Sequence, residues 1–216
     1  MSIISIVGSG KDYNTEKIKE KLKDSYYIIA CDGGLNLLHQ LGISPDLILG
    51  DLDSVDKNIL ELYKNTRTII YPTEKDLTDS EIALQKAIEM KPKKIYMLNV
   101  TGDYFDHSLA NIYNLVRDYN KDIEIEIVTS NSTIFLIKDF KEFINLSGRR
   151  VSLFPLSKCE VILEGFKYNY NKKRLKFTDY SVSNVIEDNI ATVSLKTGLI
   201  LCILFDDKAI ASKFFK

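Results

Sequence analysis

Several features are scarce in this sequence, and each scarcity excludes a class of protein. Cysteine occurs only three times in 216 residues, at Cys31, Cys159 and Cys202, each time within an apolar run. An odd number of cysteines without metal-ligand spacing predicts buried, reduced thiols and argues against a disulfide framework. Positive charge is not in excess, since the formal net charge is −1. No basic surface therefore indicates binding to nucleic acid.

Long apolar segments are also missing. The longest run, Leu199 to Phe205, is far shorter than the roughly 20 residues that a membrane-spanning helix needs, and it is typical of a β-strand. The first residues, 1–4, are too few and too uncharged for a secretory signal. We therefore expect a cytoplasmic protein without a membrane segment, in which 45% hydrophobic residues suffice for a substantial core.

The hydrophobic pattern changes near residues 130 to 142. Before this point, short apolar runs alternate with segments of helical periodicity, as in successive β-α-β units. After it, strand-like runs alternate with glycine and asparagine turns, and helical periodicity is almost absent. The sequence predicts a Rossmann-like α/β domain with a parallel sheet over residues 1–135. A small all-β domain, a β-sandwich or a partial barrel, is predicted over residues 140–216.

Two carboxylates follow a short predicted buried strand that ends at Leu49. In the run Gly50-Asp51-Leu52-Asp53-Ser54, residues two apart point to the same side of an extended chain, so Asp51 and Asp53 are expected to face one point. Ligands of open α/β sheets bind just beyond the carboxyl ends of the strands. Paired carboxylates there favour a divalent cation such as Mg²⁺ with a polyphosphate. The alternative is a pair of solvated turn residues.

A second polar segment follows the apolar run at residues 68–70. Thr78 and Glu81 have the spacing of a capping box, which predicts a helix that begins after Thr78. Lys75 and Asp76 then lie just before a helix N-terminus, whose free N–H groups suit phosphate oxygens. The acidic residues of the first turn have an equally good explanation as complements to the helix dipole. A lysine gains nothing from that dipole, which favours a functional role for it.

A third polar run, residues 102–107, follows an apolar run and leads into a predicted helix. Leu109, Ile112 and Val116 have the spacing of a buried apolar stripe on this helix. The other face carries polar residues: His107, Asn111 and Asn114. His39, the second histidine of the chain, sits among leucines and is predicted to be structural. His107 is therefore the better functional candidate.

Together with Asp32-Gly33-Gly34, which follows a predicted strand at 26–31, four strands end in acidic loops that precede helices. The carboxyl ends of parallel strands gather at one edge of the sheet. The expected edge carries six aspartates: Asp32, Asp51, Asp53, Asp76, Asp79 and Asp106. Without bound cations, the carboxylates at this edge would repel one another. The pattern therefore predicts a Mg²⁺–nucleotide site. The segment 8–10 lacks the P-loop pattern and is predicted to be a tight turn, with a nucleotide contact as the alternative.

The order of these motifs resembles the thiamine pyrophosphokinase family. The resemblance rests on D-G-G at 32–34, P-D-x-x-x-G-D-x-D-S at 45–54, K-D-x-T-D at 75–79, D-H-x-x-x-N at 106–111 and S-x-S-N at 181–184. It extends from about Ile3 to Phe205. One motif departs from the family pattern G-G-R-x-D-H: Asp103 replaces its second glycine, and Tyr104 replaces its arginine.

The resemblance implies a reaction and a set of residue roles. In this family, diphosphate passes from ATP to the hydroxyl of thiamine, which gives thiamine diphosphate and AMP, with Mg²⁺ as the required metal. The implied metal ligands are Asp51, Asp53 and Asp76, and the further catalytic residues are Lys75 and Asp79. The implied nucleotide contacts are Asp32, Gly33, Lys75, Thr78, Asp106, His107 and Asn111. The implied thiamine contacts are Ser181, Ser183 and Asn184. A homodimer with the active site between subunits is implied as well.

Two other functions fit the same motifs. One is a related diphosphokinase or phosphotransferase that acts on another small alcohol. The other is a non-catalytic protein that binds nucleotide or thiamine.

Overall fold

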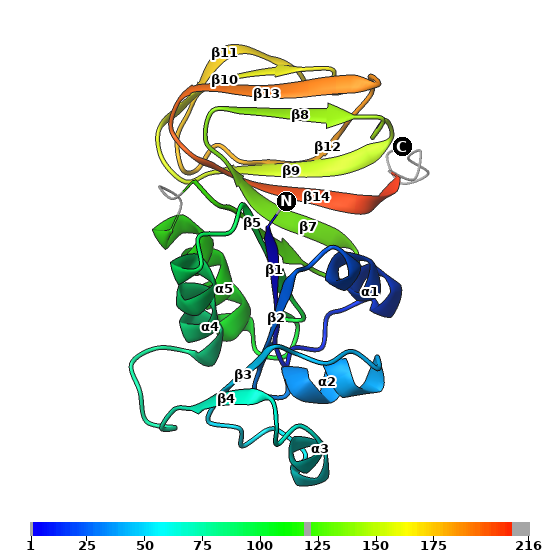
Figure 1. Ribbon diagram of the computed structural model, residues 1–216. Helices are drawn as coiled ribbons and strands as arrows, with labels where there is room; N and C mark the ends of the chain where they lie inside the picture. The colour runs from blue at the N-terminus through cyan, green and yellow to red at the C-terminus, as the bar shows by residue number, and fades with distance from the viewer. Residues whose placement is uncertain (1, 119–121, 209–216) are drawn as a thin grey trace. The chain divides into compact units, whose positions relative to one another are not determined.

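The computed structural model describes residues 2–118 and 122–208 (Figure 1). The chain forms two compact units, residues 1–130 and residues 131–216. The expected domains ended at 135 and began at 140, so the observed division falls slightly earlier. Strand β7 (Ser132–Ile137) belongs to the second unit because it pairs antiparallel with β14 (Ile200–Lys208), the last strand of that unit.

A sheet of six parallel strands forms the centre of the first unit. The strands are β1 Ile3–Val7, β2 Tyr27–Cys31, β3 Leu47–Gly50, β4 Arg67–Ile70, β5 Lys94–Leu98 and β6 Glu124–Val128. Their order in the sheet is β6-β5-β1-β2-β3-β4, and each neighbouring pair is parallel. The chain reverses its direction of growth between β1 and β5. Such a switch point is where ligands bind in open α/β sheets.

Five helices connect these strands. They are α1 Thr15–Lys23, α2 Gly34–Gln40, α3 Lys57–Leu62, α4 Asp79–Glu89 and α5 Phe105–Arg117. In Figure 1, α1 and α2 lie on one side of the sheet, and α4 and α5 lie on the other. Alternate residues of a strand face opposite sides, so a doubly covered strand is buried on both faces and is mostly apolar. All five residues of β1 are buried for this reason.

The start of α4 agrees with the sequence prediction. Thr78 is the N-cap residue, and its Oγ1 accepts a hydrogen bond from the backbone N–H of Glu81 at 3.2 Å. This contact satisfies one of the N–H groups that a helix leaves free in its first turn.

The buried face predicted for α5 was wrong. The residues of the predicted stripe are exposed or half-buried: Leu109, Ile112 and Val116. Asn111 and Asn114 are buried instead. The Asn111 Nδ2 donates to the carbonyl oxygen of Val100 at 2.8 Å. The helix therefore turns the Asn111 amide toward the loop after β5, whose buried carbonyl needs a donor, and the apolar spacing could not reveal that need.

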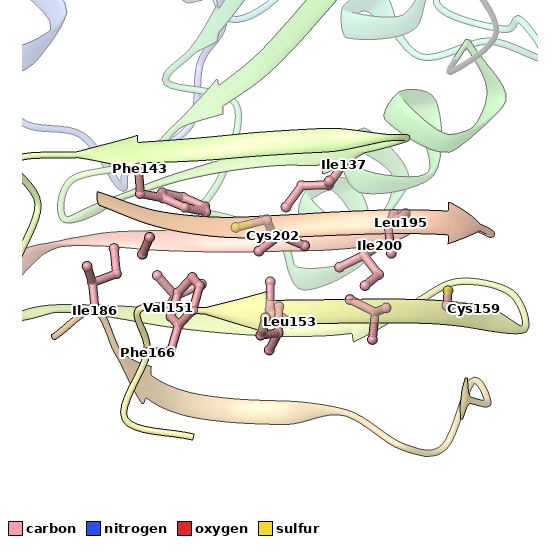
Figure 2. Close-up of a cluster of buried hydrophobic side chains, with 14 of the residues drawn as sticks. Ile137, Phe143, Val151, Leu153, Cys159, Phe166, Ile186, Leu195, Ile200 and Cys202 are labelled. Carbon is pink, nitrogen blue, oxygen red and sulfur yellow. The ribbon is translucent and has the colours of Figure 1, made fainter. Parts of the chain in front are cut away.

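The second unit is a β-sandwich, as predicted. One sheet has the order β12-β9-β14-β7 and the other has the order β11-β10-β13-β8. The remaining strands are β8 Phe140–Ile144, β9 Arg149–Pro155, β10 Cys159–Glu164, β11 Tyr170–Leu175, β12 Ser181–Val185 and β13 Ile190–Thr197. Buried side chains from both sheets form one core, which Figure 2 shows. Phe143 and Phe166 meet edge to face within it, with ring centroids 5.8 Å apart.

The three cysteines and the first part of the longest apolar run, Leu199 to Cys202, are buried. Cys31, Cys159 and Cys202 are buried free thiols, and the run from Leu199 to Phe205 supplies most of β14. Among the helices in the described part of the chain, none combines the length and apolar character needed to cross a membrane.

Candidate active site

A cavity of about 740 Å³ opens at the carboxyl edge of the parallel sheet. The loops that follow β1, β2, β3, β4 and β5 all contribute to its lining, which includes the switch point between β1 and β5. Eight residues proposed from the sequence line it: Asp32, Asp51, Asp53, Lys75, Thr78, Asp79, His107 and Asn111. The parallel topology thus brings together side chains that are widely separated in the sequence.

Three other candidates of the first unit do not line this cavity. Asp76 is exposed. The backbone N–H of Gly33 donates to Ser54 Oγ at 2.9 Å. Asp106 is exposed in the first turn of α5, and its Oδ1 accepts from the backbone N–H of His107 at 2.9 Å. Asp106 therefore serves its own helix terminus, as acidic residues commonly do.

Asp32 occupies the end of β2 in a constrained position. Its backbone has φ 48°, a left-handed conformation that aspartate tolerates better than most residues. Its Oδ1 accepts from the backbone N–H of Leu52 at 3.2 Å. A Cβ on Gly50 would lie 1.7 Å from that same Oδ1, and Gly50 has φ +136°. Glycine at position 50 is therefore what allows the Asp32 carboxylate to lie against the β3 loop.

Asp51 and Asp53 both line the cavity, but the reason given by the sequence was wrong. Strand β3 ends at Gly50, and Leu52 has φ +62°, so the chain is not extended across these residues. The Asp51 Oδ1 instead accepts from the backbone N–H of Asp53 at 3.2 Å. An aspartate that bonds the backbone two residues on forms a turn, and this turn directs the two carboxylates.

Lys75 supplies positive charge among these carboxylates. Its Nζ lies 3.1 Å from Asp79 Oδ2 and 4.0 Å from Asp51 Oδ2. It also donates to the carbonyl oxygen of Pro72 at 3.0 Å. Only 13% of the side chain is exposed, so its charge is screened much less than that of a surface lysine.

A single lysine does not balance the carboxylates around it. Burial, together with the negative charges of Asp79 and Asp51, raises the pKa of Asp32 from 3.8 to about 7, even though the N–H of Leu52 lowers it. Asp79 Oδ1 is buried without a hydrogen-bond partner among the described residues. Both observations indicate a shortage of positive charge or of donors at this edge.

This shortage fits a bound divalent cation, because carboxylate oxygens are the ligands that Mg²⁺ prefers. In residues 2–118 and 122–208, however, no three His, Cys, Asp or Glu side chains are gathered closely enough to hold a metal ion. Asp51 and Asp53 line the cavity, whereas Asp76, the third expected ligand, is exposed and does not line it. The donor chemistry is present, and the complete ligand set is not assembled.

Cys31 also lines the cavity, but it is a poor nucleophile. Burial raises the pKa of its thiol well above the ordinary value, and the charges of Asp32 and Asp79 raise it further. Only the thiolate reacts readily, so thiol chemistry is not indicated here.

Several lining residues were missed or undervalued in the sequence. They include Ser9, Gly10, Ser54, Thr101, Asp103, Tyr104 and Ser108. For Gly10 the signal in the sequence is glycine itself, which permits a close approach of two backbones. A Cβ at this position would lie 2.3 Å from the carbonyl oxygen of Thr101, because the turn after β1 packs tightly on the loop after β5. Tyr104 was noted only as a departure from the family pattern.

The three candidates for thiamine contact lie in the second unit, on the edge strand β12. The pairing of β12 with β9 shifts register between Ser181 and Asn184, which marks a bulge. Ser183 lies in this bulge with φ 57°, and its N–H donates to Ser152 Oγ at 3.1 Å. The bulge redirects the side chains of this edge strand.

Asn184 is fully buried, and the structure gives its amide other partners. Its Oδ1 accepts from the backbone N–H groups of Tyr168 at 3.1 Å and Val185 at 2.9 Å. Its Nδ2 donates to the carbonyl oxygen of Tyr168 at 2.9 Å. Asn184 therefore fixes the backbone around Tyr168, an exposed aromatic residue, rather than presenting its amide to a ligand.

The fold and the cavity define a class of protein: a doubly wound α/β unit with an acidic cavity at its switch point, continued by a β-sandwich. The family described as "Thiamin pyrophosphokinase, catalytic domain" matches residues 18–127. The family described as "Thiamin pyrophosphokinase, vitamin B1 binding domain" matches residues 136–200. The chain belongs to the thiamin pyrophosphokinase family.

Individual relatives agree with this assignment over nearly the whole chain. Thiamine pyrophosphokinase of Bacillus subtilis (strain 168) is 28% identical over 214 residues, which is 96% of this chain and 100% of the relative. The crystal structure of thiamine pyrophosphokinase from Bacillus subtilis matches with a TM-score of 0.85 at 25% identity, covering 95% of this chain and 100% of that one. The corresponding structure from Geobacillus thermodenitrificans has a TM-score of 0.82 at 26% identity, covering 95% and 98%.

The contacts of Asn184 generate a prediction about stability. Replacing Asn184 with alanine leaves two N–H groups and one carbonyl without their partner, so we expect the free energy of unfolding to fall by about 1–3 kcal/mol. Val182→Ala is the matched control: Val182 is 56% exposed on the same strand, and its truncation is expected to cost about 0.5 kcal/mol or less. Denaturant unfolding measures both variants. Equal stability of Asn184→Ala and the wild type would show that the amide does not hold this turn.

Proposed function

We propose that this chain is an enzyme that transfers diphosphate from ATP to the hydroxyl of thiamine, with Mg²⁺, and yields thiamine diphosphate and AMP. The observation that carries the proposal is the acidic cavity around Lys75 at the carboxyl edge of the sheet. Polyphosphate transfer depends mainly on positioning and on charge neutralisation, and this cavity offers both kinds of group. Thiamine is proposed as the acceptor because the relatives are named thiamine pyrophosphokinase.

The reaction needs no covalent enzyme intermediate. The hydroxyl oxygen of thiamine bonds to the β-phosphorus of ATP, and the bond between that phosphorus and the oxygen bridging to the α-phosphorus breaks. AMP leaves with the bridging oxygen. The proton of the hydroxyl passes to a carboxylate, for which we propose Asp79 because its Oδ1 has no partner among the described residues. Asp106 is the other carboxylate that could serve, but it does not line the cavity.

We assign the charged residues of the cavity to the phosphates. Lys75 neutralises β- or γ-phosphate charge, since it is the one lysine or arginine among the described residues that line the cavity, and only 13% of its side chain is exposed. Asp51 and Asp53 would hold Mg²⁺, which neutralises phosphate charge when bound. Asp76 as a third ligand rests on the family resemblance alone. The same holds for nucleotide contacts from Gly33 and Asp106, whereas Thr78 lines the cavity.

Thiamine recognition is assigned to the β-sandwich. Ser181 and Ser183 on the bulged edge strand carry the short polar side chains expected to meet the aminopyrimidine, and Asn184 acts as a positioning residue behind them. From the resemblance we further propose a cytoplasmic homodimer with its active sites between subunits.

The reaction itself is the first test. Purified protein with ATP, Mg²⁺ and thiamine is expected to form AMP and thiamine diphosphate in equal amounts, followed by chromatography. Chelation of Mg²⁺ with EDTA is expected to abolish both products, because the phosphate charge is then left unneutralised. ADP as the product would contradict diphosphate transfer. Release of AMP with another small alcohol, but not with thiamine, would favour a related diphosphokinase, and tight binding without turnover would favour a binding protein.

Asp51 provides the second test of this function. Asp51→Asn keeps the size of the side chain but removes its charge, so we expect kcat/KM to fall by at least about 100-fold, since neutralisation of phosphate charge is worth several kcal/mol. Circular dichroism is expected to show an intact fold. The control is Asp24→Asn, at an exposed position after α1 and away from the cavity, which is expected to keep wild-type activity. A fully active Asp51→Asn variant would remove Asp51 from the phosphate site.

The oligomeric state is tested by light scattering during size-exclusion chromatography. A homodimer gives a molar mass twice the 24.7 kDa of the chain. A monomer that retains full activity at the same concentration would exclude an active site that needs two subunits.

A further inference from the structure

The aromatic ring of Tyr104 is exposed to solvent at the cavity. Tyr104 lines the cavity, yet 65% of the residue is exposed. It is the N-cap residue of α5, with extended φ −110° and ψ 131°, and its side chain makes no capping hydrogen bond. The ring is therefore not used to start the helix. An exposed aromatic face of this size gains free energy when another flat ring covers it.

A second ring accompanies Tyr104 on the same helix terminus. The centroid of the His107 ring lies 5.6 Å from that of Tyr104, with the two planes tilted by 46°. His107 also lines the cavity. The two rings together form an aromatic section of the cavity wall, made by the loop and the first turn that follow β5.

The strand order separates this aromatic section from the phosphate-binding groups. Asp32 ends β2 and Asp51 follows β3, whereas Tyr104 follows β5, on the other side of β1. Neighbouring strands lie about 4.8 Å apart, so the ends of β5 and β3 are separated by roughly 14 Å. A nucleoside triphosphate has the same division, with a charged polyphosphate at one end and a flat, uncharged base at the other.

The loop that carries Tyr104 is held in place on both sides. Lys11 Nζ lies 2.9 Å from Asp103 Oδ1, which joins the turn after β1 to the residue before Tyr104. Ser108 Oγ donates to the carbonyl oxygen of Tyr104 at 3.0 Å and accepts from the N–H of Gly102 at 3.2 Å. The Ser108 bonds tie the backbone that carries the ring to the first turn of α5, and less freedom to lose lowers the entropic cost of using the ring as a binding surface.

We propose that Tyr104, next to His107, is the stacking platform for the base of the nucleotide. This inference rests on the proposed function, because it presumes that the polyphosphate occupies the end of the cavity near Asp51 and Lys75. Stacking on an aromatic face tolerates different bases, since each base has a π-face. The subsite therefore binds the purine by its plane, while the charged residues bind the phosphates.

The absence of tryptophan from the chain gives a direct test. Tyr104→Trp places a single fluorophore in the proposed subsite and preserves a stacking surface. We expect Mg²⁺–ATP to quench its fluorescence, and Mg²⁺–tripolyphosphate, which lacks a base, to leave it unchanged. The matched control is Tyr113→Trp on the same helix, because Tyr113 is 66% exposed but does not line the cavity. ATP is expected to leave its fluorescence unchanged.

Affinity gives an independent measurement by calorimetry. Tyr104→Leu is expected to weaken Mg²⁺–ATP binding about tenfold, which is within the range for losing one base stacked on one ring. Its affinity for Mg²⁺–tripolyphosphate is expected to stay unchanged, and Tyr104→Phe is expected to bind both ligands as the wild type does. Tyr113→Leu is the control for loss of a tyrosine from α5.

Several outcomes overturn the inference. They are equal loss of ATP and tripolyphosphate affinity in Tyr104→Leu, unchanged ATP affinity in that variant, and quenching of Tyr104→Trp by thiamine instead of ATP. The proposed function fails separately: if ATP quenches Tyr104→Trp and binds Tyr104→Leu more weakly, but the wild type forms no thiamine diphosphate, the reaction is refuted and the subsite stands. A wild type that forms thiamine diphosphate while Tyr104→Leu binds ATP normally refutes the subsite alone.

Discussion

Crowding of negative charge at one edge of the parallel sheet is the constraint on which the candidate site depends. Asp32 lies against the loop after β3 because Gly50 has no side chain, and its burial, together with the negative charges of Asp79 and Asp51, raises its pKa to about 7. Lys75 offsets part of this charge. Like charges brought together in a partly buried site are costly. Their presence at the point where open α/β sheets bind ligands indicates a site that is completed by cations and phosphates.

The cavity wall divides into regions of different chemistry because the loops come from different strands. The loops after β2 and β3 bring carboxylates, and the segment between β4 and α4 brings Lys75. The loop after β5 brings two aromatic rings and an aspartate already paired with Lys11. A ligand with a charged part and a flat uncharged part matches this division better than a compact anion does. Strand order, rather than any single motif, creates the match.

In the second unit, a strand bulge and a buried asparagine shape the polar segment of β12. A bulge in edge strand β12 places Ser183 in a left-handed conformation, and the fully buried Asn184 makes two hydrogen bonds to the backbone of Tyr168 and one to that of Val185. A buried amide whose donors and acceptors are all satisfied specifies one local conformation. The segment that resembles a binding motif therefore also has a structural role. Asn184 holds the local backbone in place, and its neighbours face outward.

The sequence by itself determined the class of fold, the change from α/β to all-β structure, the start of α4 at Thr78 and the family. These four features follow from local periodicity, capping chemistry and ordered motifs, which depend on residues that are close together in the sequence. Only the tertiary structure decided that Leu52 turns the chain between Asp51 and Asp53, that α5 buries asparagines, and that Tyr104 faces the cavity. Those outcomes depend on contacts between strand ends that lie far apart in the chain, and a buried carbonyl or a close backbone approach leaves no periodic signal in the sequence.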